Sequence, residues 1–438
     1  MGSYVPTTLQ ERRDMLHTVG VESYRELYRN VPDRVWLDGD LSLPEGKSEF
    51  EVRRIMTAAA EKNRVYPTIL RGAGAYRHYI PAAVKRITSR EEFLTAYTPY
   101  QAEISQGVLQ SIFEYQTMIC TLTDMDVSNA SAYDGATAAA EAITMCRERK
   151  RQKAFVAANV NPQILAVMRT YCFGSDVQLI TIPEIGGLVD ADALRKELDD
   201  SAACFLFQQP NFYGLVENAE ELVSIVHEAG AKAIMHVNPI ACALLKTPGE
   251  CGADVAVGEG QPLGMDLGFG GPWLGFMSCT DAMKRKLPGR IVGQTTDTEG
   301  KVGYVLTLTA REQHIRREKA SSNICSNQAL CALTAAIYMS CMGPEGLKEA
   351  ALQCMSKAHY FAAALESAGL KLRWQGEYFH EFVTDCTEKE SEKILNALDR
   401  EGILGGLPIP GGLLWCATEA VTREEMDRAA EIVGEVLK

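Results

Sequence analysis

The sequence lacks an apolar run as long as a membrane helix needs, which is about 18 residues. Its first residues, MGSYVPTTLQERRDML, contain no apolar signal core, and Pro6 stands where a myristoylation motif has Ser or Thr. We therefore expect a cytoplasmic protein, whether bacterial or not, or a mature organellar form whose targeting segment has been removed.

Positive charge is also in short supply. The 44 Lys and Arg residues are outnumbered by 57 Asp and Glu residues, for a formal net charge of −13. Because nucleic-acid binding needs a basic surface for the phosphates, this balance argues against a nucleic-acid partner. The hydrophobic content of 46% and charged content of 23% are those of an ordinary globular enzyme.

The sequence has no C-x-x-C motif, and none of its 13 cysteines pairs with a histidine at zinc-site spacing. An odd number of cysteines in a long chain also argues against a disulfide framework. We interpret the cysteines as small buried side chains in a reducing compartment, with no metal. Those in apolar surroundings are Cys120, Cys204, Cys242, Cys279 and Cys331.

Strand-like and helix-like runs alternate from about residue 61 to 310. KAFVAANV leads into the helical run NPQILAVMRTYCF, and CFLFQQPN, KAIMHVNP and ADVAVGEG follow as further strands. This rhythm predicts an α/β fold with a mostly parallel sheet and helices on both faces. Most of the strands end in a polar turn, which predicts a crevice along one edge of the sheet.

The 438 residues are enough for two domains with a helical extension. We predict an N-terminal helical arm over 1–60, a large α/β domain over 61–320, and a linking helix with a small α+β domain over 321–438.

The arm is predicted from two helix starts. The first is capped by Thr7 or Thr8, and the second by Ser48 with Glu51 three residues later. In the second helix the apolar residues Val52, Ile55 and Met56 are expected to face inward.

A loop with seven glycines, Gly258 to Gly275, follows the apolar run Ala253–Val257. Its position after a strand is typical of an active site. The loop contains no Lys, Ser, Cys or His, and its acids are Glu259 and Asp266. The sequence thus predicts a loop shaped like a catalytic one, without a nucleophile.

An Ala-rich helix is predicted to begin at NASAYDGATAAAEAITM. Asp134, Gly135, Ala136 and Thr137 fall in its first turn, where backbone N–H groups suit an anion such as phosphate. A plain helix cap by Asp134 is the alternative interpretation.

The chain resembles the fold-type I pyridoxal-phosphate (PLP) enzymes in layout and, in longer phrases, subunit 1 of the split glycine-cleavage P-protein. Those phrases extend over nearly the whole chain and include RGAGAYRHYIPAAV, YTPYQAEISQGVLQSIFEYQTMICTLTDMDVSNASAYDGATAAAEA, FQQPNFYG, GEGQPLGMDLGFGGPWLGF and REQHIRREKASSNICSNQAL. The resemblance implies an aspartate-aminotransferase-like large domain and a small C-terminal α+β domain.

The resemblance also implies a function. This chain is expected to be the alpha subunit of the P-protein, which assembles with a beta subunit, as α2β2 in the family. The complex decarboxylates glycine and passes the aminomethyl group to the lipoyl arm of the H-protein. Its cofactor, PLP, serves as an electron sink and is expected on the beta subunit.

Two positions depart from a working PLP site. Asn238 stands where PLP enzymes have an Asp that keeps the pyridine nitrogen protonated, and a neutral amide supplies no charge for this. Gln261 stands where the beta half has the Schiff-base Lys, and an amide cannot take that role. We therefore expect no catalytic residue on this chain alone, with residual cofactor-site positions at Asp134, Gly135, Thr137, Asn238 and Gln261.

Two segments are candidates for a pocket wall or an interface with the partner. The segment RGAGAYRHYIP supplies Arg71, Tyr76 and His78, and YTPYQAEISQ supplies Tyr97, Thr98, Tyr100, Gln101, Glu103, Ser105 and Gln106. Glu103 is alternatively a helix cap. The basic residues of REQHIRREK form a solvated face, an interface anchor or a docking surface for an acidic lipoyl carrier.

Two further functions stay open at this point. One is a self-sufficient PLP enzyme that uses Lys246, the single Lys between Asn238 and Gly275. The other is a regulatory or binding module without a catalytic partner.

Overall fold

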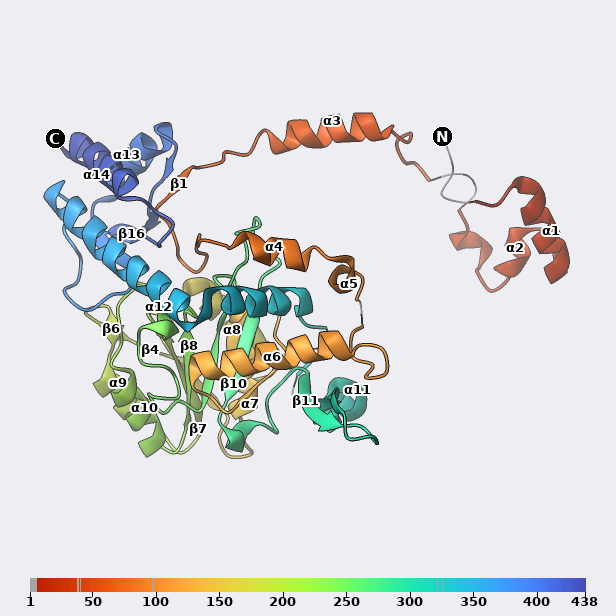
Figure 1. Ribbon diagram of the computed structural model, residues 1–438, viewed down its shortest axis with the longest axis horizontal. Helices are drawn as coiled ribbons and strands as arrows, with labels where there is room; N and C mark the ends of the chain where they lie inside the picture. The colour runs from red at the N-terminus through yellow and green to blue at the C-terminus, as the bar shows by residue number, and fades with distance from the viewer. Residues whose placement is uncertain (1–5, 38, 40, 97, 321, 325) are drawn as a thin grey trace. The chain divides into compact units, whose positions relative to one another are not determined.

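The computed structural model describes residues 6–37, 39, 41–96, 98–320, 322–324 and 326–438 (Figure 1). The chain divides into two compact units, residues 1–64 and 65–438. The first unit is helical, and its elements are α1 (Leu9–Val19), α2 (Tyr24–Leu27), the 3-10 turn η1 (Asp33–Val35) and α3 (Glu49–Ala60).

Both long helices of the first unit begin with a capping box. Thr8 accepts the backbone N–H of Glu11, and Ser48 accepts that of Glu51, as the sequence predicts. The expectation that Val52, Ile55 and Met56 face inward is wrong for this chain: they are exposed, and the described residues of α1–α3 include none that is buried.

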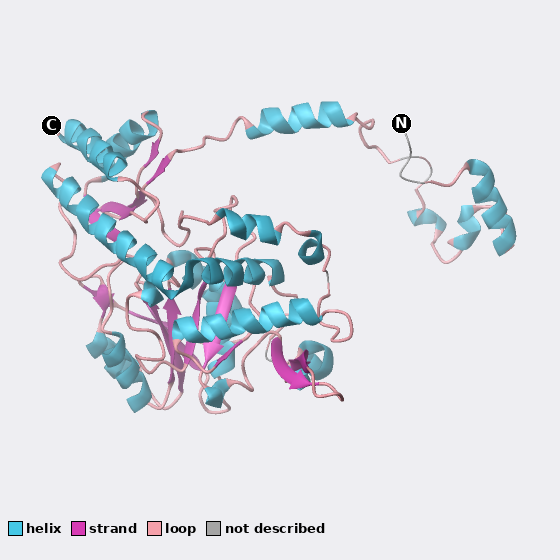
Figure 2. Ribbon diagram, viewed as in Figure 1, coloured by secondary structure: helices cyan, strands magenta, loops and turns pink. Residues whose placement is uncertain are grey.

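A seven-stranded sheet in the order β2-β10-β9-β8-β7-β3-β4 forms the centre of the second unit (Figure 2). Its central pairs are parallel, and β10 runs antiparallel to both of its neighbours. The strands are β2 (Val127–Ser128), β3 (Lys153–Ala157), β4 (Leu179–Ile182), β7 (Ala202–Gln209), β8 (Lys232–Val237), β9 (Val255–Glu259) and β10 (Gly275–Cys279).

These strands consist almost entirely of buried apolar residues because helices cover the sheet. Helix α7 packs against β9 and β10, whereas α6 packs beside α12 and against β2. Figure 1 shows α6 and α12 running side by side across the sheet. The helices are α6 (Gln106–Thr123), α7 (Gly135–Cys146), α8 (Pro162–Gly174), α9 (Ala191–Glu197), α10 (Ala219–Glu228) and α12 (Ala329–Ser367).

Helix α12 belongs to two hydrophobic cores. Its residues from Cys331 to Cys354 pack in the core of the large sheet, and those from Ala358 to Leu365 pack in the C-terminal core. Gly343, at φ 62°, interrupts the helix just before Pro344. The predicted linking helix is present as α12, which begins at Ala329 and continues past this kink to Ser367.

The C-terminal core lies between a three-stranded antiparallel sheet, β13-β16-β15, and two helices that pack on each other. Its elements are β13 (Glu381–Asp385), α13 (Glu388–Arg400), β15 (Leu407–Ile409), β16 (Gly412–Cys416) and α14 (Arg423–Leu437). The division of the second unit at residue 320 stays a prediction.

Smaller elements connect these layers. They are β1 (Thr68–Ile69), which pairs with β14 (Ile403–Leu404), the helices α4 (Ala82–Thr88), α5 (Glu91–Leu94) and α11 (Gln313–Arg316), the pair β5 (Glu184–Ile185) and β6 (Leu188–Val189), and the hairpin of β11 (Ile291–Thr296) and β12 (Val302–Thr307).

Candidate functional site

A cavity of about 650 Å³ lies at the carboxyl ends of β8 and β9, where the sequence predicts a crevice. The start of α7 forms one wall, the loops after these strands form another, and the segment 71–76 closes it. Its polar lining includes Tyr133, Asp134, Asn161, His236, Asn238 and Glu259. We call it the sheet-edge cavity.

Two carboxylates of the chain itself accept backbone N–H groups in the first turn of α7. Asp134 caps the helix by accepting the backbone N–H of Thr137 at 2.7 Å, which confirms the cap interpretation. The backbone N–H of Gly135 donates to Oε2 of Glu259 at 2.9 Å. A carboxylate of this chain thus takes the position that the sequence predicts for an external anion.

Both carboxylate oxygens of Glu259 accept hydrogen bonds from the backbone. Its Oε1 accepts the backbone N–H groups of Gln261 and Leu274, both at 3.0 Å. Burial raises the pKa of Glu259 to about 7, although the three N–H donors oppose the shift. A side chain at Gly135 would place its Cβ only 2.7 Å from the Glu259 nitrogen, so the helix start and β9 can approach only with glycine there.

The side chain of Gln261 is buried and bridges two loops. Its Oε1 accepts the backbone N–H of Tyr76 at 2.9 Å, and its Nε2 donates to the Tyr76 carbonyl at 2.9 Å and to that of Met265 at 2.8 Å. One amide thus pairs both backbone polar groups of Tyr76. This contact joins residues 185 positions apart, and sequence reasoning missed it.

Asn238 follows β8 directly, as predicted, but its amide serves the local fold. Oδ1 accepts the backbone N–H of Ile240 at 2.9 Å and of Ala241 at 3.2 Å, and Nδ2 lies 3.2 Å from Nε2 of His380. His236 lies two residues earlier, on the same face of the strand. Burial lowers its pKa to about 4, so the ring is neutral at pH 7, and neither ring nitrogen has a hydrogen-bond partner among the described residues.

Tyr76 and Arg71 tie the segment 71–76 to the C-terminal sheet. The Tyr76 hydroxyl donates to Oε2 of Glu381 at 2.8 Å, and Oε1 of Glu381 accepts the backbone N–H of Ala73 at 2.6 Å. Burial raises the pKa of Glu381 to about 7. Arg71 donates to the carbonyls of Gly405 and Gly406 at 2.9 and 2.8 Å, so its guanidinium is a structural tie.

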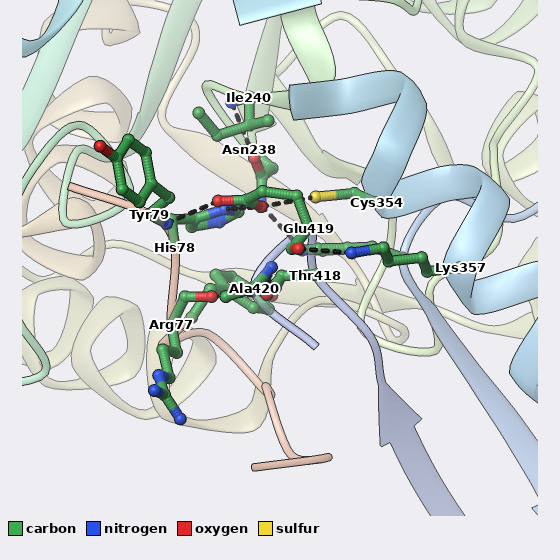
Figure 3. A network of polar contacts seen from close by, with 12 residues as sticks. Arg77, His78, Tyr79, Asn238, Ile240, Cys354, Lys357, Thr418, Glu419 and Ala420 are labelled. Carbon is green, nitrogen blue, oxygen red and sulfur yellow. Dashed lines mark hydrogen bonds and ion pairs between the residues drawn. The ribbon is translucent and has the colours of Figure 1, made fainter. Parts of the chain in front are cut away.

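His78 belongs to a second polar cluster, around Glu419 (Figure 3). Oε2 of Glu419 lies 2.7 Å from Nδ1 of His78 and accepts the thiol of Cys354 at 3.2 Å, while Oε1 accepts the backbone N–H of Tyr79 at 2.6 Å. Burial alone would raise the pKa of Glu419, but the His78 contact and the Tyr79 N–H lower it to about 2. The cluster borders an open cavity of about 730 Å³ lined by Arg77, Tyr79, Asp266 and residues of α12. We call it the rim cavity.

The other candidate segment is placed between α5 and α6. Tyr100 donates to Oδ1 of Asn327 and lies under the guanidinium of Arg290, 4.1 Å from the ring centre. Gln106 pairs with the backbone N–H and carbonyl of Tyr304 at 2.8 and 2.9 Å. Tyr97 lies outside the described residues.

The remaining candidate residues of that segment differ in solvent exposure. Thr98, Gln101 and Glu103 are exposed, and Ser105 is half-buried. The cap interpretation of Glu103 is wrong, because Ser105 occupies the N-cap position of α6 and makes no side-chain cap hydrogen bond.

Lys246 points into solvent and pairs with Glu220 at 2.6 Å. It is absent from the residues that line the sheet-edge cavity. In the basic segment, Arg311 is half-buried and donates to the carbonyls of Leu287 and Gly289. The exposed members are His314, Arg316, Arg317 and Lys319.

The described cysteines are free thiols, and most are buried, among them Cys204, Cys242, Cys279 and Cys331. Cys120 is half-buried. Among the described helices, none has the length and apolar composition to span a membrane.

The glycine cleavage system P-protein family model matches residues 2–433. The chain belongs to the glycine cleavage system P-protein family. A protein of Syntrophomonas wolfei subsp. wolfei named probable glycine dehydrogenase (decarboxylating) subunit 1 is 48% identical over 435 residues, which are 98% of this chain and 99% of that protein. A protein of the same name from Bacillus cytotoxicus is 44% identical over 444 residues, with 99% of each chain covered.

A crystal structure of the P-protein of the glycine cleavage system, glycine decarboxylase in inhibitor-bound form, superposes with a TM-score of 0.92 and 40% identity. The match covers 99% of this chain and 100% of that one. A sphingosine-1-phosphate lyase of Burkholderia pseudomallei has the same fold, at a TM-score of 0.66 and 15% identity over 91% of this chain and 92% of that one. The fold is that of the PLP-dependent fold-type I enzymes, as the sequence predicts.

The P-protein fold implies PLP, but the sheet-edge cavity of this chain does not fit the cofactor. Glu259 occupies the N–H of Gly135, where a phosphate needs a free donor. Gln261 has no amine, and its amide is bound on both sides. The pyridine position offers Asn238, a neutral amide that is already hydrogen-bonded.

Proposed function

We propose that this chain is the alpha subunit of a glycine cleavage P-protein, within which a second, beta, subunit carries PLP. The complex decarboxylates glycine and transfers the aminomethyl group to the lipoyl group of the H-protein. We place the assembly in the cytoplasm and expect an α2β2 stoichiometry. The reaction itself is assigned to the partner's cofactor.

One observation carries this proposal: at the cavity that corresponds to a cofactor site, Glu259 takes the N–H of Gly135, and Gln261, at the Schiff-base position, is bound to the backbone of Tyr76. Family membership over residues 2–433 supports the reaction, and the names of the relatives, as a subunit 1, support a second chain. The self-sufficient alternative is not supported, because Lys246 is exposed and paired with Glu220.

The chain's own contribution in this proposal is to support and enclose the partner's site. The candidate surfaces are the exposed residues of the segments 76–79 and 98–106, held by buried anchors. A site that excludes water and orients its substrate gains rate through both effects, so a protein wall without a catalytic group still affects turnover.

The test is reconstitution. The chain is expressed alone, and together with a beta subunit whose strand-end motif is His-Lys, and glycine decarboxylation is measured with lipoylated H-protein. We expect the two chains to form a stable, active complex, and we expect no turnover of glycine by this chain alone. Turnover of glycine by this chain alone contradicts the proposal, as does failure of the two chains to associate.

A further inference from the structure

We propose that Gln261 is a positioning residue, which holds the segment Tyr76–Tyr79 so that its exposed side chains complete the partner's site. This role rests on the proposed function. It gives the residue at the former lysine position a task of its own within the P-protein complex.

The segment Tyr76–Tyr79 is anchored at each of its residues. Gln261 pairs the N–H and carbonyl of Tyr76, and Thr418 donates from Oγ1 to the Arg77 carbonyl at 2.5 Å. Glu419 holds the His78 ring and the Tyr79 N–H. Backbone that is bound from several sides loses little further entropy when a ligand or partner contacts it.

The anchored segment alternates in exposure, as an extended strand does. Tyr76 and His78 are buried, whereas Arg77 is exposed and Tyr79 is 61% exposed. Figure 3 shows the His78 ring directed toward Glu419 and the Arg77 side chain directed away from it. The buried pair fixes the segment, whereas the guanidinium of Arg77, which donates to the Pro67 carbonyl at 2.6 Å, and the phenol of Tyr79 stay exposed for contact with another chain.

Gln261 also joins the two sides of the rim cavity. It bonds Tyr76, the residue before Arg77, and Met265, the residue before Asp266, and both Arg77 and Asp266 line that cavity. The amide therefore sets the spacing between the anchored segment and the glycine-rich loop.

The chemistry of the three contacts requires an amide. Oε1 accepts one N–H, and Nε2 donates to two carbonyls. A lysine offers donors but no acceptor, and a methionine of similar length offers no donor and only a weak sulfur acceptor, so either weakens or removes the partner of the buried Tyr76 N–H.

The test compares Gln261→Met with Gln178→Met, the same change at an exposed position before β4, at the opposite edge of the sheet. Hydrogen exchange is followed in the isolated chain over residues 72–80. In the complex with the beta subunit, kcat and KM for glycine are measured, together with the PLP content of the partner. We expect exchange of the Tyr76 amide at least tenfold faster and kcat/KM at least tenfold lower in Gln261→Met, with PLP content unchanged and Gln178→Met like the wild type.

Unchanged exchange of the Tyr76 amide in Gln261→Met overturns the claim that Gln261 holds this segment. Full activity despite faster exchange overturns the role of Gln261 in the reaction. If that variant does not fold, Thr418→Val is used, because it removes the hydrogen bond to the Arg77 carbonyl while conserving shape. Faster exchange over residues 76–79 and the same loss of kcat/KM are expected. A wild-type complex without activity contradicts the proposed function, whereas an active wild type with an equally active variant contradicts the positioning role alone.

Discussion

The carboxylate of Glu259 accepts the backbone N–H of Gly135 at 2.9 Å, which places an internal anion at the start of α7. In PLP enzymes of this fold the corresponding helix start holds the cofactor phosphate. In the P-protein chain described here, a side chain of the chain itself therefore satisfies a backbone donor at this helix start.

Replacement of Glu259 by Gln tests whether the carboxylate stabilises the fold by accepting these buried N–H groups. The variant conserves the side-chain volume, but one of the two carboxylate oxygens becomes an NH2 donor. If Oε1 is replaced, two backbone N–H groups lose their acceptor, and if Oε2 is replaced, one does. We expect the free energy of unfolding to fall by about 1–3 kcal/mol. Urea denaturation measures it, with the exposed Glu299→Gln as control. Equal stability of the two variants contradicts the assignment.

Glu381 makes stability depend on pH. Its pKa rises from 4.5 to about 7 in the folded chain because it is buried, so the folded state binds the proton more tightly than the unfolded state. Its contribution is complete below pH 4.5 and is lost as pH rises through about 7, by an amount on the order of 3 kcal/mol. We expect Glu381→Gln to lose less stability than the wild type between pH 5 and pH 8 in denaturation series. Parallel curves contradict this.

Glu419 has the opposite dependence. Its folded pKa of about 2 lies below its ordinary 4.5, so its contribution is present above pH 4.5 and lost as pH falls through about 2. At pH 7 we expect Glu419→Gln to destabilise the chain by about 1–3 kcal/mol, because one carboxylate oxygen becomes a donor and a buried hydrogen-bond partner of Glu419 loses its acceptor. The exposed Glu435→Gln is the matched control, and a loss no larger than in that control refutes the buried pair.

The segment 98–106 is predicted to act on the partner. Gln101 and Glu103 are exposed and do not cap α6, so Gln101→Ala with Glu103→Ala is expected to leave the thermal midpoint of the isolated chain unchanged. Glycine decarboxylation by the complex is expected to fall at least tenfold. Calorimetry of the chain and kinetics of the complex provide the two readouts, and full activity of the double variant removes this segment from the shared site.

Lys246 is predicted to be dispensable. Its ion pair with Glu220 is exposed, and such pairs are screened by solvent. Lys246→Met is expected to match the wild type in thermal midpoint and in activity of the complex. Loss of activity with a normal midpoint favours the alternative in which this lysine reacts.

Much of the fold could be predicted because local pattern and tertiary structure agree. The alternating apolar runs become β3, β7, β8 and β9, and Asp134 caps the helix as its position before an Ala-rich run indicates. Asn238 likewise falls at the end of its strand. These features depend on residues near one another in sequence.

What could not be predicted depends on contacts between distant residues. Glu259 and Gly135 are separated by 124 positions, and Gln261 and Tyr76 by 185, so no local pattern reveals either hydrogen bond. The expectation for Val52, Ile55 and Met56 failed for a related reason. An apolar helix face indicates that some surface can pack against it, but it does not indicate which surface that is.

The location of the cofactor tests the central claim most directly. The complex is loaded with PLP, reduced with borohydride and digested, and the pyridoxyl-lysine is mapped by mass spectrometry. The account predicts that the label is confined to the beta subunit, with none on Lys246 or any other lysine of this chain. A pyridoxyl-lysine on this chain contradicts it.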